Sequence, residues 1–413
     1  MQPKPIFDNL DHLENPYYQN RFDASPWTHI TEANSDLQHA LYFLYSYKGS
    51  TATYNSYRRE IERLLQWTWC VKNMHIEMLR REHLEEFIEF CMAPPKDWIG
   101  TKNVARFKDK QGQRVANPDW RPFVVPLTKE HKALGKAVSA KDYQPSQKAL
   151  QATFSILSSF FNFLVQEEFI FGNPVALIRQ KSKFIQKNQN TDRIRRITNY
   201  QWDEVIRVTE KLAEANPEQH ERTLFIIKAL LGMYLRISEL VADERSTPVM
   251  GDFQMDQDRN WWFHVLGKGN KTRLVSVSHD MLEALKRYRT HRGLSPLPLP
   301  GEHTPLIPKI AGKGPVTSTR QIRNVVQLCF DLAYDALVEQ GQQMEASELK
   351  VATVHWLRHT GISEDVKIRP REHVKEDAGH SSMATTDKYI DSEMRERHAS
   401  AANKKIKREA HES

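Results

Sequence analysis

The chain has 413 residues, of which 39% are hydrophobic and 27% charged, and its formal net charge is +7. This length exceeds what one hydrophobic core ordinarily supports, so we expect two domains. The sequence has no apolar run of the roughly eighteen residues that a membrane span needs, and no secretory signal. Three widely spaced cysteines argue against a disulfide scaffold, so we expect a cytoplasmic protein. The positive charge favours a polyanionic partner, because neutralised phosphates release counterions.

The first part of the chain is predicted to be a helical domain over residues 29–178, preceded by an arm. Residues 1–28 contain four prolines, which predict an extended arm. Apolar residues at helical spacing then predict helices over residues 35–44, 53 to about 72 and 81–91, and a long helix from Ser146. Arg58 falls between the apolar positions of the second helix, where it can face solvent or a phosphate.

Residues from about 93 to 145 interrupt this helical pattern as an insertion or long loop. Prolines and glycines punctuate the stretch, and basic residues such as Arg106 alternate with aromatic ones such as Trp98 and Trp120. Such a length favours a functional segment over a plain connector. Two interpretations stay open, a grip on DNA or a solvated surface excursion.

A basic linker and a second domain are predicted to follow. Residues 179–197 contain many basic side chains and no apolar periodicity, which is typical of a hinge that lies along a DNA backbone or of an ordinary flexible linker. Thr198, with Gln201 three residues later, predicts the start of a helix in a domain over residues 198–413. That domain ends in a polar tail, about 391–413, which either docks on a neighbouring protomer or is solvated.

The second domain is predicted to combine helices with a small sheet. An apolar helix over residues 221–233 should be buried and should deliver Arg236 at its end. Lys268 should lie at a hairpin tip where glycines allow close approach to DNA. Short strands are expected over residues 252–256, 261–266 and 273–277, and helices over 280–290 and 318–339.

The stretch from His355 to Tyr389 gathers side chains suited to chemistry on an anion. His355 and Arg358 are three residues apart, which places an imidazole and a guanidinium on one helix face. His380 precedes Tyr389 by nine residues. His355 and His359 stand four apart like a zinc pair, but no Glu follows His355, so we expect no metal.

Five motifs stand in series over roughly 150 residues, counted along the sequence, and each alone is a weak signal. They are Leu235-Arg236-Ile237-Ser238-Glu239-Leu240, Gly267-Lys268-Gly269, His355-x-x-Arg358, Gly379-His380 and Tyr389. In this order and spacing the chain resembles the tyrosine recombinase, or phage integrase, family. The resemblance implies a mainly α fold with a small antiparallel β-sheet. A helical SAM-like core-binding domain would precede an α+β catalytic domain, and the two would clamp DNA.

The resemblance also implies a DNA strand-breaking and rejoining enzyme with type IB topoisomerase-like transesterification and no cofactor. Tyr389 would be the nucleophile that forms a 3'-phosphotyrosine, and His355 would accept or steer its proton. Arg236 and Arg358 would hold the non-bridging phosphate oxygens. Lys268 would protonate the leaving 5'-oxygen.

Further roles within the site, and contacts with DNA outside it, are assigned less directly. His380 would hydrogen-bond the phosphate, and Glu239 is interpreted as holding Arg236. Candidate DNA-binding residues are Arg58, Lys271, Arg273, Arg320 and Arg323. Three departures from the family pattern stand out: the insertion, Tyr234 in place of a usual glycine, and Asp377-Ala378 in place of two leucines.

We therefore expect a site-specific recombinase that works through a Holliday junction and integrates or excises a mobile genetic element. Its partner would be double-stranded DNA, bound by a homotetramer on synapsed sites, with monomers or dimers when free and an accessory DNA-bending protein as an optional partner. We expect no membrane association and a place in the cytoplasm near the nucleoid. Two alternatives stay open. One is a resolvase of chromosome or plasmid dimers, and the other is a DNA-binding regulator that does not cleave.

Overall fold

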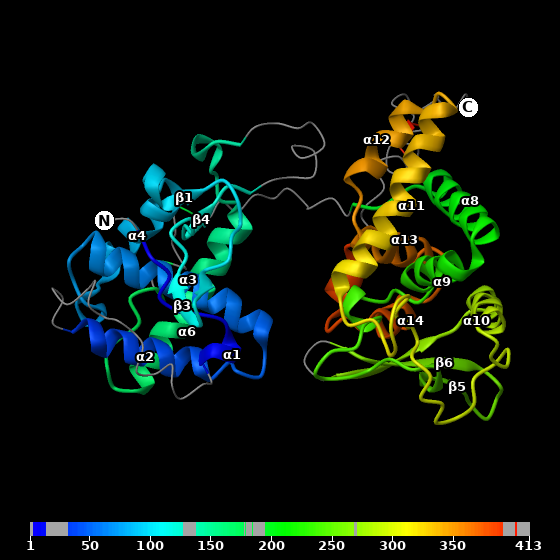
Figure 1. Cartoon of the computed structure of the whole chain (residues 1–413), viewed down its shortest axis with the longest axis horizontal. Coiled ribbons are helices and arrows are strands. Elements are labelled where there is room, and N and C mark those ends of the chain that lie inside the picture. Colours follow the sequence, from blue (N-terminus) through cyan, green and yellow to red (C-terminus); the bar gives the residue numbers. More distant parts are fainter. Residues whose placement is uncertain are drawn as a thin grey trace, which may run out of the picture. The chain divides into compact units, whose positions relative to one another are not determined.

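The computed structural model describes residues 3–13, 32–126, 138–176, 178, 184, 195–267, 271–390 and 401–402. The chain divides into two compact units, residues 1–189 and 190–413, and each is described by itself (Figure 1). The division falls within the predicted linker, 179–197, most of which lies outside the described residues. No helix among the described residues has the length and apolarity to cross a membrane.

The N-terminal unit is built around helix α3, Thr51–Cys70. Ser50 caps this helix through its hydroxyl, which accepts a hydrogen bond from the Thr53 backbone nitrogen at 3.4 Å. The apolar face of α3 packs against α2 and α6, where Phe43 and Phe160 have ring centroids 5.2 Å apart. The helices of the unit are α1 (Leu10–Leu13), α2 (Ala33–Tyr45), α3, η2 (Ile76–Met78), α4 (Arg81–Met92), η3 (Lys96–Trp98), η4 (Ala140–Asp142) and α6 (Gln147–Gln166).

Residues 3–13 pack onto α3 and do not form the extended arm that the prolines predicted. Ile6 and Phe7 are fully buried, and their backbone nitrogens donate to the Glu62 carboxylate at 2.5 and 3.2 Å. The Tyr54 hydroxyl donates to the Asp8 carbonyl at 2.9 Å. This packing buries two apolar side chains and gives a buried carboxylate the hydrogen-bond donors that it needs. The remainder of the predicted arm, residues 14–28, lies outside the described residues.

The stretch predicted as an insertion or long loop carries two small sheets. Strands β2 (Phe107–Lys110) and β3 (Gln113–Ala116) form an antiparallel hairpin, with Phe107 opposite Ala116. Strands β1 (Ile99–Gly100) and β4 (Phe123–Val124) pair in parallel. Trp98, Trp120 and Phe123 are buried, so the described part of this stretch belongs to the folded unit and is no solvated excursion.

The C-terminal unit surrounds helix α9, Pro217–Gly232, which contacts helices α8, α10 and α13. Its sheet is antiparallel in the order β5-β6-β7, with Phe253 opposite Phe263 and Phe263 opposite Val275. Its strands are β5 (Phe253–Met255), β6 (Trp261–Leu266) and β7 (Thr272–Ser276). Its other helices are α8 (Asn199–Ala215), η5 (Ile237–Glu239), η6 (Met250–Asp252), α10 (His279–His291), α11 (Thr319–Glu339), α12 (Gln343–Val351), α13 (Val354–Asp365), α14 (Arg371–Ala378) and α15 (Met383–Asp387).

The turn between α9 and Arg236 is held by a close contact with α13. Tyr234 has φ 49°, a left-handed conformation that glycine adopts without cost, and its side chain is buried. A Cβ added at Gly361 in α13 would lie 2.3 Å from the Leu231 carbonyl oxygen and 3.0 Å from the Tyr234 ring. Only glycine therefore lets α13 approach this turn, and the approach brings His355 and Arg358 towards Arg236.

Candidate active site

Arg236 is held by a carboxylate that it shares with a second arginine. The Glu239 carboxylate accepts from the Arg236 backbone nitrogen at 2.7 Å and from Arg236 Nη1 at 3.0 Å. It also accepts from Arg273 Nη1 and Nη2 at 2.7 and 2.8 Å. Burial acts to raise the pKa of Glu239, but the hydrogen bonds from Arg273 and Arg236 outweigh it, and the pKa is lowered. The interpretation that Glu239 holds Arg236 is confirmed.

Arg358 is buried against two backbone carbonyls that flank the site. Its Nη1 donates to the Tyr234 carbonyl and its Nη2 donates to the Ala378 carbonyl at 2.5 Å. Burial and the nearby charge of Arg236 lower the pKa of Arg358 to about 10, so the guanidinium remains charged at neutral pH. Arg236 keeps 30% of its side chain exposed, so its guanidinium is the more accessible of the two.

Histidines surround the Tyr389 hydroxyl, and the nearest of them is His359, for which the sequence predicted no catalytic role. The Tyr389 hydroxyl lies 2.7 Å from His359 Nδ1. The His359 ring contacts the His355 ring edge-on at 4.3 Å between centroids, and the His380 ring stacks on Tyr389 at 5.8 Å. Thus His359, and not His355, lies within hydrogen-bonding distance of Tyr389.

The two histidines that flank Tyr389 are neutral at physiological pH. Burial, followed by the neighbouring His355 and Arg358, lowers the pKa of His359 to about 4. Burial, followed by Arg358 and Arg236, lowers the pKa of His380 to about 4 as well. A neutral imidazole has one nitrogen that can accept a hydrogen bond, so His359 is placed to accept one from the Tyr389 phenol in the tautomer with a bare Nδ1.

These lowered pKa values predict acid sensitivity of the C-terminal unit. In the unfolded chain a histidine titrates near 6.5, so between about pH 6.5 and 4 the unfolded state binds more protons than the folded state. The stability that His359 and His380 contribute is present above pH 6.5 and is lost as the pH falls towards 4. We expect the Tm to fall with acidification less steeply in His359→Asn than in the wild-type chain, as measured by circular dichroism.

The comparison between variant and wild type matters because burial raises the pKa of two acids, Asp36 and Asp252, and raised acids have the opposite effect. Burial raises the pKa of Asp36, in the N-terminal unit, to about 7, so its protonation favours the folded state as the pH falls from 7 towards 4. The difference in slope isolates the histidine. Equal slopes for His359→Asn and the wild-type chain would contradict the buried neutral imidazole.

Asp377, which departs from the family pattern, takes part in a polar network behind the site. Its carboxylate accepts from Arg369 Nη2 at 2.6 Å, from the Ser276 backbone nitrogen at 3.1 Å and from the Ser276 hydroxyl. Arg369 also donates to Tyr234 Oη at 3.0 Å and to Asp365 at 3.1 Å, and the Tyr234 hydroxyl donates to Asp365. The network ties α14 and β7 to the turn before Arg236. An ion pair therefore replaces the apolar packing that leucines would provide.

We expect Asp377→Asn to destabilise the chain by about 2 kcal/mol, because removing one partner leaves Arg369 without its closest carboxylate. For a unit of this size that corresponds to a fall in Tm of about 4 to 8 °C. Asp387→Asn is the matched control, since its ion pair with Arg371 is exposed and is expected to contribute less than about 1 kcal/mol. Thermal unfolding followed by circular dichroism measures both, and equal shifts for the two variants would contradict the role of the network.

The other predicted site residues are only partly described. Lys268 lies outside the described residues, while the flanking Gly267 donates from its backbone nitrogen to the Lys271 carbonyl at 2.8 Å. Of the predicted DNA-binding residues, Lys271, Arg320 and Arg323 are exposed. Arg273 is instead engaged with Glu239 and has only 10% of its side chain exposed, and Arg58 donates to the Asp8 carbonyl in the N-terminal unit. The described residues contain no cluster of three metal-ligating side chains.

Comparison with known proteins gives consistent matches over most of the chain. No family model matches it. It is 25% identical over 259 residues to tyrosine recombinase XerC of Chlorobaculum parvum, which covers 60% of this chain and 70% of that protein. It is 25% identical over 323 residues to tyrosine recombinase XerC of Anoxybacillus flavithermus, covering 77% and 91%. Its fold matches the crystal structure of XerH site-specific recombinase bound to palindromic difH substrate, with TM-score 0.53 and 15% identity over 98% of this chain and 99% of that one.

Proposed function

We propose that the chain belongs to the tyrosine recombinase family and that it cleaves and rejoins double-stranded DNA at specific sites through a covalent phosphotyrosine. The observation that carries the proposal is the Tyr389 hydroxyl, 2.7 Å from His359 Nδ1 in a site that also contains two arginines, Arg236 and Arg358. A buried phenol next to a neutral base and two fixed positive charges suits attack on a phosphodiester.

In the proposed reaction Tyr389 Oη attacks the phosphorus, and the bond from phosphorus to the 5'-oxygen breaks. Burial raises the pKa of Tyr389, an effect that Arg358 and Arg236 partly offset, so the phenol needs a proton acceptor. His359 Nδ1 takes that proton. Lys268 donates a proton to the leaving 5'-oxygen, and the product is a 3'-phosphotyrosine with a free 5'-hydroxyl. Rejoining is the reverse attack by a 5'-hydroxyl.

The arginines stabilise the negative charge that develops on the non-bridging oxygens. Arg236 presents its accessible guanidinium while Glu239 fixes its orientation, and Arg358 supplies a buried positive charge behind it. His380 hydrogen-bonds the phosphate from the side of the stacked Tyr389 ring. Each donor is set before the substrate arrives, so little reorganisation is needed in the transition state.

The proposed biological reaction is integration or excision of a mobile genetic element by a homotetramer on two synapsed duplexes. Support comes from the net charge of +7 and from the folded stretch at residues 99–126, which adds surface to the N-terminal unit. The exposed Lys271, Arg320 and Arg323 would contact the duplex backbone.

Trapping of the covalent complex tests the proposal. The substrates are overlapping duplexes that together cover the DNA flanking the gene, each nicked near a candidate site. On cleavage such a duplex releases a short fragment and stays covalently attached to the protein. We expect a slow-migrating adduct on a denaturing gel, with chelator present, for the wild-type chain and for the exposed-tyrosine control Tyr200→Phe. Tyr389→Phe should bind the same duplex and give no adduct. Binding without an adduct in all three proteins would contradict cleavage and favour a non-cleaving regulator.

A further inference from the structure

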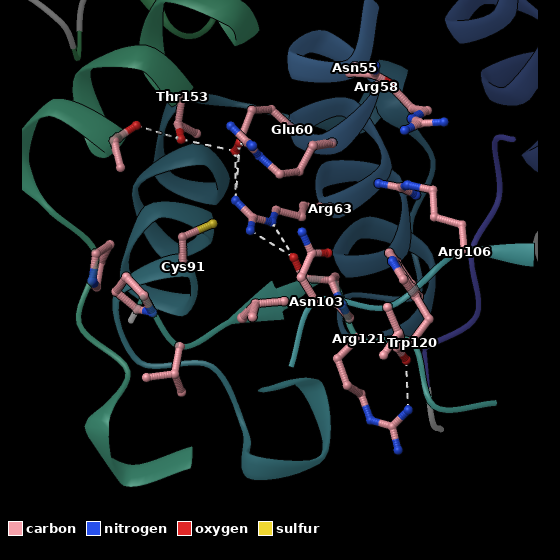
Figure 2. Close-up of a pocket in the computed structure, with 18 of the residues that line it drawn as sticks. Asn55, Arg58, Glu60, Arg63, Cys91, Asn103, Arg106, Trp120, Arg121 and Thr153 are labelled. Atoms are coloured by element: carbon pink, nitrogen blue, oxygen red, sulfur yellow. Dashed lines mark hydrogen bonds and ion pairs between the residues drawn. The ribbon is translucent and has the colours of Figure 1, made fainter. Parts of the chain in front are cut away.

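A large basic cavity lies in the N-terminal unit, and none of the active-site residues lines it (Figure 2). Its volume is about 960 Å³. Helices α3 and α6 form part of its wall, and residues 103–107 and 120–126 of the folded stretch close another part. The stretch that has no counterpart in the family pattern therefore contributes part of the wall of this cavity.

The cavity has an excess of positive charge. Six arginines and two carboxylates are among the side chains that line it. Glu60, one of the two carboxylates, already pairs with both Arg59 and Arg63. Asp8, the other, accepts from Arg114 at 2.9 Å through each of its oxygens. Neither lining carboxylate therefore forms an ion pair with Arg58, while Arg106 pairs with Glu62, which does not line the cavity.

Arg58 and Arg106 form a like-charged pair on one side of the cavity, where both side chains lie close together in Figure 2. Arg106 pairs with the buried Glu62, whereas Arg58 donates to the Asp8 backbone carbonyl. Arg58 Nε is buried and has no hydrogen-bond partner among the described residues. Burial and then the charge of Arg106 lower the pKa of Arg58, and nearby carboxylates only partly offset this effect. An anion between the two guanidiniums would supply the missing charge and acceptor.

We propose that this cavity binds phosphate groups, with Arg58 and Arg106 as the two principal donors. Planar guanidinium forks suit the tetrahedral oxygens of a phosphate, and half-buried ones bind more strongly than those in bulk water. The Arg106 guanidinium carbon lies 4.9 Å from the centroid of the Trp120 ring, and this contact fixes the orientation of the guanidinium. The phosphate could belong to a free phosphorylated compound or to the backbone of DNA, and the chemistry of recognition is the same.

Inorganic pyrophosphate is the probe, and hydrogen–deuterium exchange of the full chain locates its site. Pyrophosphate can also bind Arg236 and Arg358. The readout is therefore restricted to protection from exchange in peptides from α3 and from residues 103–126. We expect saturable protection there in the wild-type chain and in the control Arg81→Gln, an exposed arginine of α4 that does not line the cavity. Arg58→Gln and Arg106→Gln should each raise the concentration for half-maximal protection at least about tenfold.

Two arms separate the sources of the phosphate. If pyrophosphate competes with duplex DNA and Arg58→Gln also weakens duplex binding, the site takes backbone phosphates. If duplex binding is unchanged, the site takes a free phosphorylated compound. Should Arg58→Gln fail to fold, Arg121→Gln tests the same cavity from another position. No protection in the wild-type chain overturns the proposal, and so does protection at the wild-type concentration in both Arg58→Gln and Arg106→Gln, whatever the outcome for DNA cleavage.

Discussion

Arg236→Lys is expected to lower the rate of DNA cleavage by about 10²- to 10³-fold, the usual effect of losing one preorganised donor to a developing negative charge. A lysine keeps the positive charge but cannot hold Glu239 and a phosphate with one planar fork. Duplex binding should change far less, because backbone contacts elsewhere supply most of it. Single-turnover cleavage of the nicked duplex measures the rate.

A nearby arginine provides the control for this prediction. Arg245 pairs with Asp243 on the surface, and 41% of its side chain is exposed. Arg245→Lys is expected to cleave at the wild-type rate. If Arg236→Lys cleaves as fast as Arg245→Lys, the guanidinium of Arg236 does not stabilise the transition state and its assignment is wrong.

His359→Asn is expected to lower cleavage by about 10²- to 10⁴-fold, the range for loss of a general base. The asparagine keeps a polar side chain beside Tyr389 but cannot take its proton. Because burial holds the pKa of His359 near 4, the wild-type rate should stay insensitive to the protonation of this group down to about pH 5 and fall as the pH approaches 4. Cleavage rates measured over that range test both statements.

His355→Asn distinguishes the two histidines of α13. The sequence assigned the proton of Tyr389 to His355, whereas the structure places His359 at 2.7 Å. We expect the larger loss for His359→Asn. A large loss for His355→Asn with near wild-type cleavage by His359→Asn would return the role to His355.

The candidate active-site motifs could be found in the sequence because their order and spacing resemble those of the tyrosine recombinase family. The sequence also predicted the buried helix before Arg236 and the three strands of the C-terminal sheet, which the structure contains as α9, β5, β6 and β7. The structural confirmation that Glu239 holds Arg236 follows from a local spacing of three residues. Short-range patterns of this kind are readable without knowledge of the fold.

Features that depend on distant partners were not predictable in the same way. His359 was weighed only as a zinc ligand, because nothing local shows that Tyr389 folds back against it from 30 residues away. Arg273 was taken as a DNA contact, since its partner Glu239 lies 34 residues earlier in the chain. Asp377 was noted only as a loss of apolar packing, because its pairing with Arg369 requires the turn of α14 to be known.

Mass spectrometry of the trapped protein–DNA complex tests the central claim most directly. After nuclease and protease digestion of the wild-type adduct, we expect a nucleotide remnant on one peptide, with fragmentation that places it on Tyr389. The same peptide from His359→Asn should carry much less of the remnant after an equal reaction time. A remnant on any other residue, or an adduct that forms in Tyr389→Phe, would contradict Tyr389 as the nucleophile and with it the reaction proposed for this chain.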